Sequence, residues 1–216
     1  MKQFVIFVFN FFKCFFLPQI RFMRLSPNKS GKIFFYDKKR SEFLKVEIRE
    51  SIDSTIADQV FTYNSYDLTF LRRYNDLLTT YNKIVSDNKI PLILDCGANI
   101  GLSSLFFARD FPRAKVLAIE PEKNNFAMMK VNCKNFENVK IFNFAIGSKV
   151  GFATIDNKSG NNNSFTITRD TKKKGDVEIL SINKVLSDNI DLIPFIVKID
   201  IEGFEKDLFS ANTDWV

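Results

Sequence analysis

The sequence predicts an α/β fold in which helices flank a mostly parallel sheet. Two observations support this fold class. From residue 90 onward, apolar runs alternate regularly with segments of helical periodicity, which is the pattern of βαβ units. The chain also has 216 residues, 45% of them hydrophobic, which is enough for one sizeable core but too few for two full-sized domains. We therefore expect one main domain over residues 90–216, preceded by a small extension.

The first 24 residues are apolar and basic, and their structure is left open by the sequence. Residues 1–17 are rich in Phe, but Asn10 and Lys13 interrupt the run and Pro18 ends it, so it falls short of the ~20 residues that span a bilayer. No small-x-small cleavage site follows. The basic residues that come next would suit an anionic membrane surface: Arg21, Arg24, Lys29 and Lys32. Residues 1–32 are therefore expected either to contact a membrane peripherally or to pack on the core as a helix or edge strand.

Residues 25–89 are predicted to form a hairpin followed by a helix. Leu44, Val46 and Ile48 alternate with charged residues, which is typical of a half-buried strand, and a charged turn separates them from the apolar run before it. From Asp67 the periodicity changes to that of one long amphipathic helix, which is expected to pack on the sheet. The apolar positions of this helix are Phe70, Leu71, Tyr74, Leu77, Leu78, Tyr81, Ile84 and Val85.

The main domain is predicted to begin with a strand at 91–95 and a helix around 102–109. A strand at 115–120 leads into a second helix, with Pro121 in its first turn. A third strand is expected over residues 139–147. The composition between Ser148 and Asp176 then turns to Gly, Asn, Ser, Thr and Lys, and alternating runs there predict an inserted hairpin. The remaining predicted elements are a strand at 177–182, a short helix near 184–186 and a strand at 195–200.

The charge distribution and the cysteine and histidine counts exclude several classes of site. Residues 1–90 hold 15 Lys and Arg against 9 Asp and Glu, whereas residues 91–216 hold 16 of each, so the main domain lacks the net basic charge of a nucleic-acid-binding core. The chain has three cysteines, Cys14, Cys96 and Cys133, and no two of them are spaced as a CxxC pair. This spacing argues against a disulfide framework and against a zinc–thiolate site. The cysteines indicate a cytoplasmic location, with the inner face of the membrane as the place of any peripheral contact. The absence of histidine leaves acid–base chemistry to carboxylates, Lys, Tyr or water.

The stretch LILDCGANIGLSS, residues 92–104, is expected to carry a ligand site. In parallel α/β sheets, ligands bind beyond the carboxyl ends of the strands, where loops lead into helix N-termini. Gly97 and Gly101 would let the backbone turn tightly and approach a ligand. The spacing lacks the middle glycine of a dinucleotide fingerprint and the Gly-Lys-Ser/Thr of a P-loop. The spacing of Asp95, Gly97, Asn99 and Gly101 is instead typical of S-adenosylmethionine sites.

Glu120 is a second marker of such a site. It ends the second strand, 25 residues after Asp95, where a carboxylate can accept hydrogen bonds from both ribose hydroxyls of an adenosine. By itself Glu120 would equally suit the position before a helix N-terminus, where the helix dipole favours negative charge. Combined with the glycine loop, it favours the ribose role.

These segments together resemble the FkbM-type S-adenosylmethionine-dependent methyltransferases. The resemblance covers roughly residues 49–216 and rests on ILDCGANIGLSSLFFA, AIEPEKNN, NFAIGS and above all IVKIDIEGFE. It implies a Rossmann-like class I methyltransferase fold with S-adenosylmethionine as cofactor. The sequence departs from the family in two places: the chain stops at LFSANTDWV, before the further strands that complete this fold, and Asn183 stands where the family commonly has an aspartate.

The resemblance also implies roles for individual residues. Glu120 would hold the ribose of the cofactor, and residues 143–146, with Ala145 among them, would border the adenine. The methionine part of the cofactor would be lined by Asp95, Gly97, Asn99 and Gly101.

The segment that follows the last predicted strand is expected to carry the chemistry. S-adenosylmethionine supplies an activated methyl group, so the protein must chiefly align the acceptor and exclude water. Without histidine, Asp200 is the candidate base or orienting group, with Glu202 and Glu205 beside it. The two glutamates would equally suit a helix N-terminus. Lys198 lies within an apolar strand and is expected to pair with Asp95 or Asp200. Asp200 and Glu202 could also bind a divalent cation, but nothing in the sequence requires a metal.

The sequence therefore predicts an S-adenosylmethionine-dependent O-methyltransferase that acts on a hydroxyl of a sugar, glycan or related metabolite, and the acceptor class comes from the family resemblance alone. A nucleic-acid methyltransferase is disfavoured, because no Asn-Pro-Pro-Tyr-type loop follows the fourth strand and the main domain has no net positive charge. The remaining alternative is a truncated, non-catalytic binding module that associates with a membrane through its Phe-rich start. Retention of both acidic residues of the cofactor site counts against it.

Overall fold

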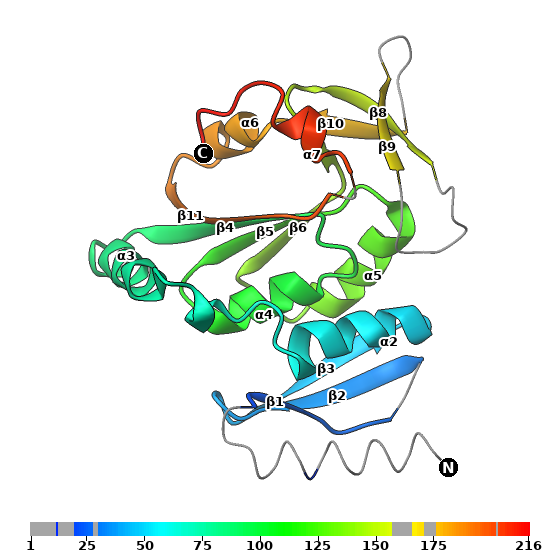
Figure 1. Cartoon of the computed structure of the whole chain (residues 1–216), viewed down its shortest axis with the longest axis vertical. Coiled ribbons are helices and arrows are strands. Elements are labelled where there is room, and N and C mark those ends of the chain that lie inside the picture. The colour runs from blue at the N-terminus through cyan, green and yellow to red at the C-terminus, as the bar shows by residue number, and fades with distance from the viewer. Residues whose placement is uncertain (1–11, 13–19, 28–29, 157–165, 171–175, 202) are drawn as a thin grey trace. The chain divides into compact units, whose positions relative to one another are not determined.

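The computed structural model describes the chain except for residues 1–11, 13–19, 28–29, 157–165, 171–175 and 202 (Figure 1). The chain divides into two compact units, Met1–Phe70 and Leu71–Val216. The apolar run at residues 1–17 lies outside the described residues except for Phe12. Within the part of the chain that the structure describes, no helix is long and apolar enough to cross a membrane.

The first unit combines an antiparallel sheet with a short helix. Its strands are hydrogen-bonded in the order β1-β2-β3, and the pairing of β2 with β3 confirms the predicted hairpin. The rings of Phe22 and Phe35 each lie 5.0 Å from the ring of Phe61, so the sheet and the turn after the helix share one aromatic core. The elements are β1 (Phe22–Arg24), β2 (Gly31–Asp37), β3 (Glu42–Ile48), α2 (Ser51–Ala57), the π-helical turn η1 (Asp58–Thr62) and the 3-10 turn η2 (Leu68–Phe70).

Two of the basic residues near the N-terminus are engaged inside this unit. Arg21 Nε lies 3.0 Å from Oδ1 of Asp37, whose side chain is fully buried. The Arg24 guanidinium pairs with Asp58 and donates to Ser54 Oγ at 3.0 Å. These contacts tie β1 to β2, α2 and η1. The peripheral membrane contact expected of residues 1–32 stays a prediction.

The second unit is built on a parallel sheet. Its strands run in the order β11-β4-β5-β6, and each neighbouring pair is parallel. Helices α4 and α5 lie on one side of this sheet, and α6 and α7 lie on the other (Figure 1). The arrangement confirms the predicted α/β class and is compatible with a Rossmann-like methyltransferase. The elements are α3 (Tyr74–Ser86), β4 (Ile90–Cys96), α4 (Leu102–Asp110), β5 (Lys115–Ile119), α5 (Lys123–Cys133), β6 (Val139–Phe142), β7 (Ala145–Ile146), β8 (Gly151–Asp156), β9 (Thr166–Asp170), β10 (Val177–Leu180), α6 (Ile182–Ser187), β11 (Leu192–Ile199) and α7 (Glu205–Leu208).

The predicted third strand is divided between two sheets. Residues of β6 extend the parallel sheet, whereas β7 belongs to a second sheet of order β7-β10-β8-β9. The chain changes sheets at Asn143, whose Nδ2 donates to the carbonyls of Glu120 and Pro121 at 2.9 Å each and so replaces ladder hydrogen bonds. The antiparallel pairing of β8 with β9 confirms the predicted inserted hairpin.

Two helices begin later than the sequence predicts. The first, α3, starts at Tyr74 rather than near Asp67, because Asp67 accepts a hydrogen bond from the Thr69 N–H and the chain makes the 3-10 turn η2 before the helix. Likewise, Pro121 precedes α5 instead of lying in its first turn. Glu122 is the N-cap of α5, since its carboxylate accepts the Asn125 N–H at 2.7 Å.

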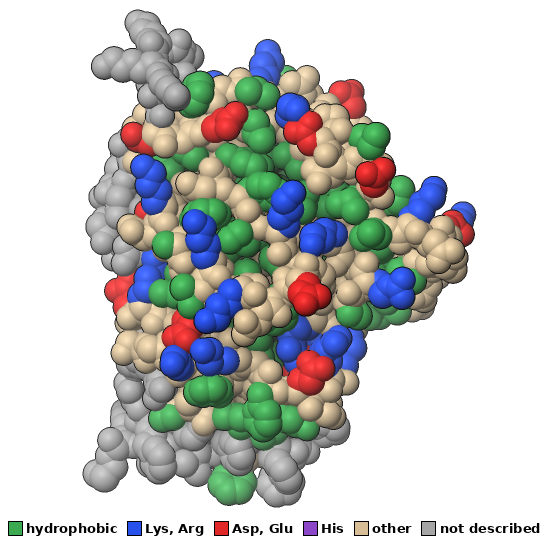
Figure 2. Space-filling view, turned by 180° about the vertical axis from the view of Figure 1, so that it is seen from behind, with side chains coloured by type: hydrophobic (Ala, Val, Ile, Leu, Met, Phe, Trp, Pro, Cys, Tyr) green, Lys and Arg blue, Asp and Glu red, His purple; other side chains and the backbone are tan. Residues whose placement is uncertain are grey.

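Helix α3 packs on the sheet, as its amphipathic pattern predicts. The Tyr81 ring lies 5.1 Å from Phe111 and 5.5 Å from Phe195, and the Tyr81 hydroxyl accepts the Arg113 N–H at 3.0 Å. These contacts join α3 to the end of α4 and to β11. On the face drawn in Figure 2, the Lys and Arg side chains of the described residues are interspersed with acidic and hydrophobic ones.

Candidate active site

The loop after β4 brings the backbone of two strands into direct contact. Gly97 has φ +77, in the left-handed region that favours glycine, and a Cβ on it would lie 1.8 Å from the carbonyl oxygen of Asp200. Asn99 also has a positive φ, of +52, which Asn tolerates better than most residues. The loop therefore takes a shape that depends on the residue types at 97 and 99, and it lies against the chain that leaves β11.

Gly101 allows two helices to pack closely. It is the N-cap of α4 with φ +90, and a Cβ there would lie 2.9 Å from Cys133 Sγ and 3.0 Å from Met129 Cγ. The residue thus allows α4 to start close to α5. Burial raises the pKa of the Cys133 thiol to about 12, and that of Cys96 to about 12 as well, so both side chains are neutral and act as small apolar groups.

A buried charged cluster lies beneath the loop. Asp95 is fully buried and accepts hydrogen bonds from Ser103 Oγ and Ser104 Oγ, both at 2.6 Å. The Lys198 ammonium lies 3.0 Å from Asp95 Oδ1 and donates to the Gly97 carbonyl at 2.7 Å. The pairing that the sequence predicts for Lys198 is therefore present, and this residue holds β11, β4 and the glycine loop together.

The Glu120 carboxylate is the central acidic group of the loop region. Its Oε2 accepts the Asn99 N–H at 2.8 Å and its Oε1 accepts the Glu122 N–H at 2.9 Å. Burial raises the pKa of Glu120 to about 7, against the lowering effect of these hydrogen bonds. The Asn125 side chain is a third hydrogen-bond partner of this carboxylate and also lowers its pKa.

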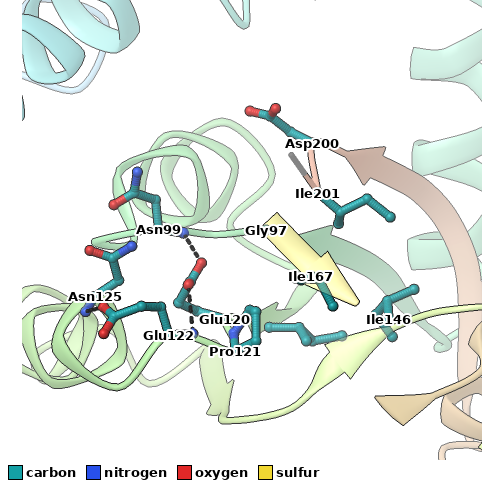
Figure 3. A pocket seen from close by; sticks show the side chains of 11 residues that line it. Gly97, Asn99, Glu120, Pro121, Glu122, Asn125, Ile146, Ile167, Asp200 and Ile201 are labelled. Carbon is teal, nitrogen blue, oxygen red and sulfur yellow. Dashed lines mark hydrogen bonds between the residues drawn. The ribbon is translucent and has the colours of Figure 1, made fainter. Parts of the chain in front are cut away.

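A pocket lies at the carboxyl ends of β4, β5 and β11, next to Glu120 and the glycine loop. The space between its lining residues amounts to about 570 Å³ when the open solvent at its mouth is included. Polar side chains gather on one side of it and isoleucines on the other (Figure 3). The lining residues are Gly97, Asn99, Ile119, Glu120, Pro121, Glu122, Asn125, Ile146, Ile167, Asp200 and Ile201.

The pocket collects some of the predicted site residues but not all of them. Gly97, Asn99, Glu120 and Asp200 line it. The other four described candidates lie elsewhere: Asp95 and Lys198 in the buried cluster, Gly101 at the start of α4, and Ala145 fully buried in β7. Next to Ala145, Ile146 does reach the pocket.

Among the described residues of the acidic segment after β11, Asp200 contributes an exposed carboxylate to the pocket. The Asp200 side chain is 62% exposed, and its Oδ2 lies 3.7 Å from Lys198 Nζ. Glu205 accepts the Ile201 N–H at 3.1 Å, which fits the helix-terminus role for this residue. The candidate Glu202 lies outside the described residues. Among the residues that the structure does describe, no group of three or more acidic or cysteine side chains is placed to hold a metal ion.

Sequence reasoning missed several lining residues. Glu122, the N-cap of α5, and Asn125, in its first turn, follow Glu120 closely in the sequence, so their proximity to it could have been predicted. Ile167 comes from the inserted hairpin, and no sequence pattern links it to the glycine loop.

Comparison with known proteins agrees with this geometry. The model of the methyltransferase FkbM domain matches residues 95–215, which is more than half of the chain. Methyltransferase sdnD of Sordaria araneosa is 61% identical over 31 residues, which make up 14% of this chain and 12% of that protein. No solved structure matches the chain. The domain match begins at the aspartate before the glycine loop and includes the whole pocket, and it shows that the chain belongs to the FkbM methyltransferase family.

Proposed function

We propose that the chain is an S-adenosylmethionine-dependent O-methyltransferase. One observation carries the proposal: the pocket joins the glycine loop after β4 to a buried carboxylate, Glu120, that directly follows β5. Parallel α/β sheets bind nucleotides at this place, with an acidic residue for the ribose hydroxyls. Gly97 lines the pocket, and its lack of a Cβ lets the loop lie directly against the Asp200 carbonyl.

The lining residues fit the parts of this cofactor. Glu120 would accept hydrogen bonds from the ribose hydroxyls, and Asn99 fixes the position of its carboxylate through the backbone N–H. The apolar side chains of Ile119, Pro121 and Ile146 would contact the adenine ring. Gly97 and Asn99 are the members of the predicted methionine subsite that reach the pocket.

Asp200 is the proposed base or orienting group for the acceptor. S-adenosylmethionine supplies an activated methyl group, so the remaining task is to align a hydroxyl and receive its proton. The exposed Asp200 carboxylate lines the pocket from the β11 side, where an acceptor can approach from solvent. Lys198 acts through Asp95 and Gly97 and is a positioning residue. A sugar, glycan or related metabolite is the proposed acceptor class.

Binding of S-adenosylhomocysteine by calorimetry tests the cofactor site. Wild-type protein is expected to bind about tenfold more tightly at pH 8 than at pH 6, because the Glu120 carboxyl, with a pKa of about 7, must lose its proton to accept both ribose hydroxyls. Glu120→Gln should bind about 10- to 100-fold more weakly at pH 8 and lose this dependence. Glu178→Gln, on the exposed face of β10, is the matched control and should behave as wild type. Absence of saturable binding to folded wild-type protein would contradict the proposal.

Methyl transfer to a panel of mono- and oligosaccharides tests the acceptor class and the role of Asp200. Asp200→Asn should bind S-adenosylhomocysteine within about twofold of wild type, while its transfer rate falls by about 10²- to 10⁴-fold, the usual contribution of a general base. Full turnover by the variant would remove Asp200 as base. Failure of every sugar to accept the methyl group from a cofactor-binding protein would refute the proposed acceptor class.

A further inference from the structure

The inserted hairpin β8–β9 contributes a wall to the candidate cofactor pocket. Ile167 of β9 lines the pocket together with Ile146 of β7, although the two residues belong to different strands of the second sheet. Figure 3 shows their side chains on the side of the pocket opposite to Asn99 and Asn125. A ligand with one hydrogen-bonding end and one apolar, planar end would fit this division.

A bidentate ion pair holds the strand that carries Ile167. Arg169 follows two residues later on β9, and its Nε and Nη2 donate to the two oxygens of Asp207 at 2.9 and 2.8 Å. Asp207 is in α7, seven residues after Asp200. The pair therefore connects the two walls of the pocket that come from β9 and from the chain after β11.

The Asp207 carboxylate is saturated with donors. It also accepts the Ser148 N–H at 2.9 Å and the Ser148 hydroxyl at 3.2 Å. The hydrogen bonds from Arg169 lower the pKa of Asp207, so the carboxylate is ionised at neutral pH. Arg169 additionally donates to the Lys149 carbonyl at 3.2 Å. The guanidinium thus bridges α7 and the start of β8, and a lysine could not reproduce this planar set of contacts.

We infer that Ile167 forms the apolar wall against the purine ring of the bound nucleoside, and that the Arg169–Asp207 pair is the positioning device that holds it there. The inference rests on the proposed cofactor and assigns the inserted hairpin to recognition of its base. An adenine ring presents two flat apolar faces, and burying one face of it against a branched aliphatic side chain removes that surface from water.

The hairpin itself provides the matched control. Ile155 of β8 is the direct cross-strand partner of Ile167 and packs on the same core, but it does not line the pocket. Calorimetric titration of the full chain with S-adenosylhomocysteine should show about tenfold weaker binding for Ile167→Ala, since a few buried methyl and methylene groups are lost, and unchanged binding for Ile155→Ala. Equal effects of the two substitutions, or none, would overturn the inference.

Methyl NMR of isoleucine-labelled protein gives a second measurement, which would show no change on ligand binding if Ile167 only stabilised the fold. On saturation with S-adenosylhomocysteine, the Ile167 δ1-methyl resonance should shift through the ring current of the purine, while that of Ile155 stays in place. The shift should be reduced in Arg169→Gln and retained in Arg73→Gln, which removes an exposed arginine of the pair Arg73–Asp76. An unmoved Ile167 resonance at saturation would refute the inference and leave the proposed function standing. Absence of any S-adenosylhomocysteine binding to wild type would instead refute the proposed function.

Discussion

Replacement of Lys198 by Met is expected to reduce the free energy of unfolding of the second unit by about 3 to 5 kcal/mol, the usual cost of removing one partner of a buried ion pair. The Lys198 side chain is only 10% exposed, and Asp95 beside it is fully buried. Without the ammonium, the Asp95 carboxylate would keep only the two serine hydroxyls as partners. The Gly97 carbonyl would also lose a donor at 2.7 Å.

Urea unfolding followed by Trp215 fluorescence measures this effect. Trp215 is the chain's one tryptophan and packs against the core of the second unit, so its emission reports that unit. Lys184→Met is the control, because the pair of Lys184 with Asp188 is half-exposed and should contribute at most about 1 kcal/mol.

A double substitution separates the lost charge from lost packing. In Asp95→Asn/Lys198→Met, a neutral amide that still accepts the serine hydroxyls replaces the unpaired carboxylate. This variant should recover at least about half of the lost stability, because the main cost of the single change is the uncompensated charge. A double variant as unstable as Lys198→Met would show that the aliphatic stem of Lys198, not its charge, is what the core requires.

The parts of the site that were predicted from the sequence are those encoded by local patterns. The glycine loop and Glu120 follow two successive apolar strands, and parallel strands place their carboxyl ends at one edge of the sheet. The same logic predicted that Lys198 faces a carboxylate, since an unpaired lysine in an apolar strand would be too costly. In these cases the residue type, the alternation of the strand and the sheet topology together restrict where the side chain can lie.

The remaining features depend on packing between segments distant in sequence. Gly101 was predicted as a ligand-binding residue, which stays a prediction, and the sequence did not indicate that its lack of a Cβ also makes room for Cys133 and Met129 of α5. Asp95 was predicted to line the methionine part of the cofactor, which stays a prediction; in the structure its carboxylate contacts Ser103, Ser104 and Lys198. An aspartate before a glycine loop suits both a ligand contact and an ion pair in the core, and the sequence pattern does not distinguish the two.

The division of the third strand has a similar cause. Apolar residues run from β6 through β7, and the two-residue alternation of a strand cannot by itself show that the chain leaves one sheet for another. At the change of sheets, the Asn143 side chain donates to the two carbonyls after β5, a contact that the alternation of apolar residues does not reveal. The contribution of Ile167 follows from this second sheet, because β9 is held near the pocket through β8 and β10.

Substitution of Gly97 by Ala is expected to disrupt both the fold of the second unit and cofactor binding. The new Cβ would meet the Asp200 carbonyl oxygen at 1.8 Å, and the residue would have to keep φ +77. Gly203→Ala is the matched control, because Gly203 has φ +88 but its Cβ would meet nothing within 4 Å. The control should lose about 1 to 2 kcal/mol for the left-handed backbone alone, and Gly97→Ala should lose about 1 to 3 kcal/mol more through overpacking.

The clash at Gly97 cannot be relieved by a rotamer change, because the atom it meets is a backbone oxygen held in place by the Asp200 N–H bond to the Cys96 carbonyl at 3.0 Å. The end of β11 must therefore move away from β4, and Asp200 and Ile201 must move with it. S-adenosylhomocysteine affinity should fall at least about tenfold in Gly97→Ala, by analogy with other displacements of about 1 Å in a site. Trp215 fluorescence shows whether Gly97→Ala is folded. If the folded Gly97→Ala variant binds S-adenosylhomocysteine as tightly as Gly203→Ala does, the loop accommodates a side chain and the pocket does not require glycine at position 97.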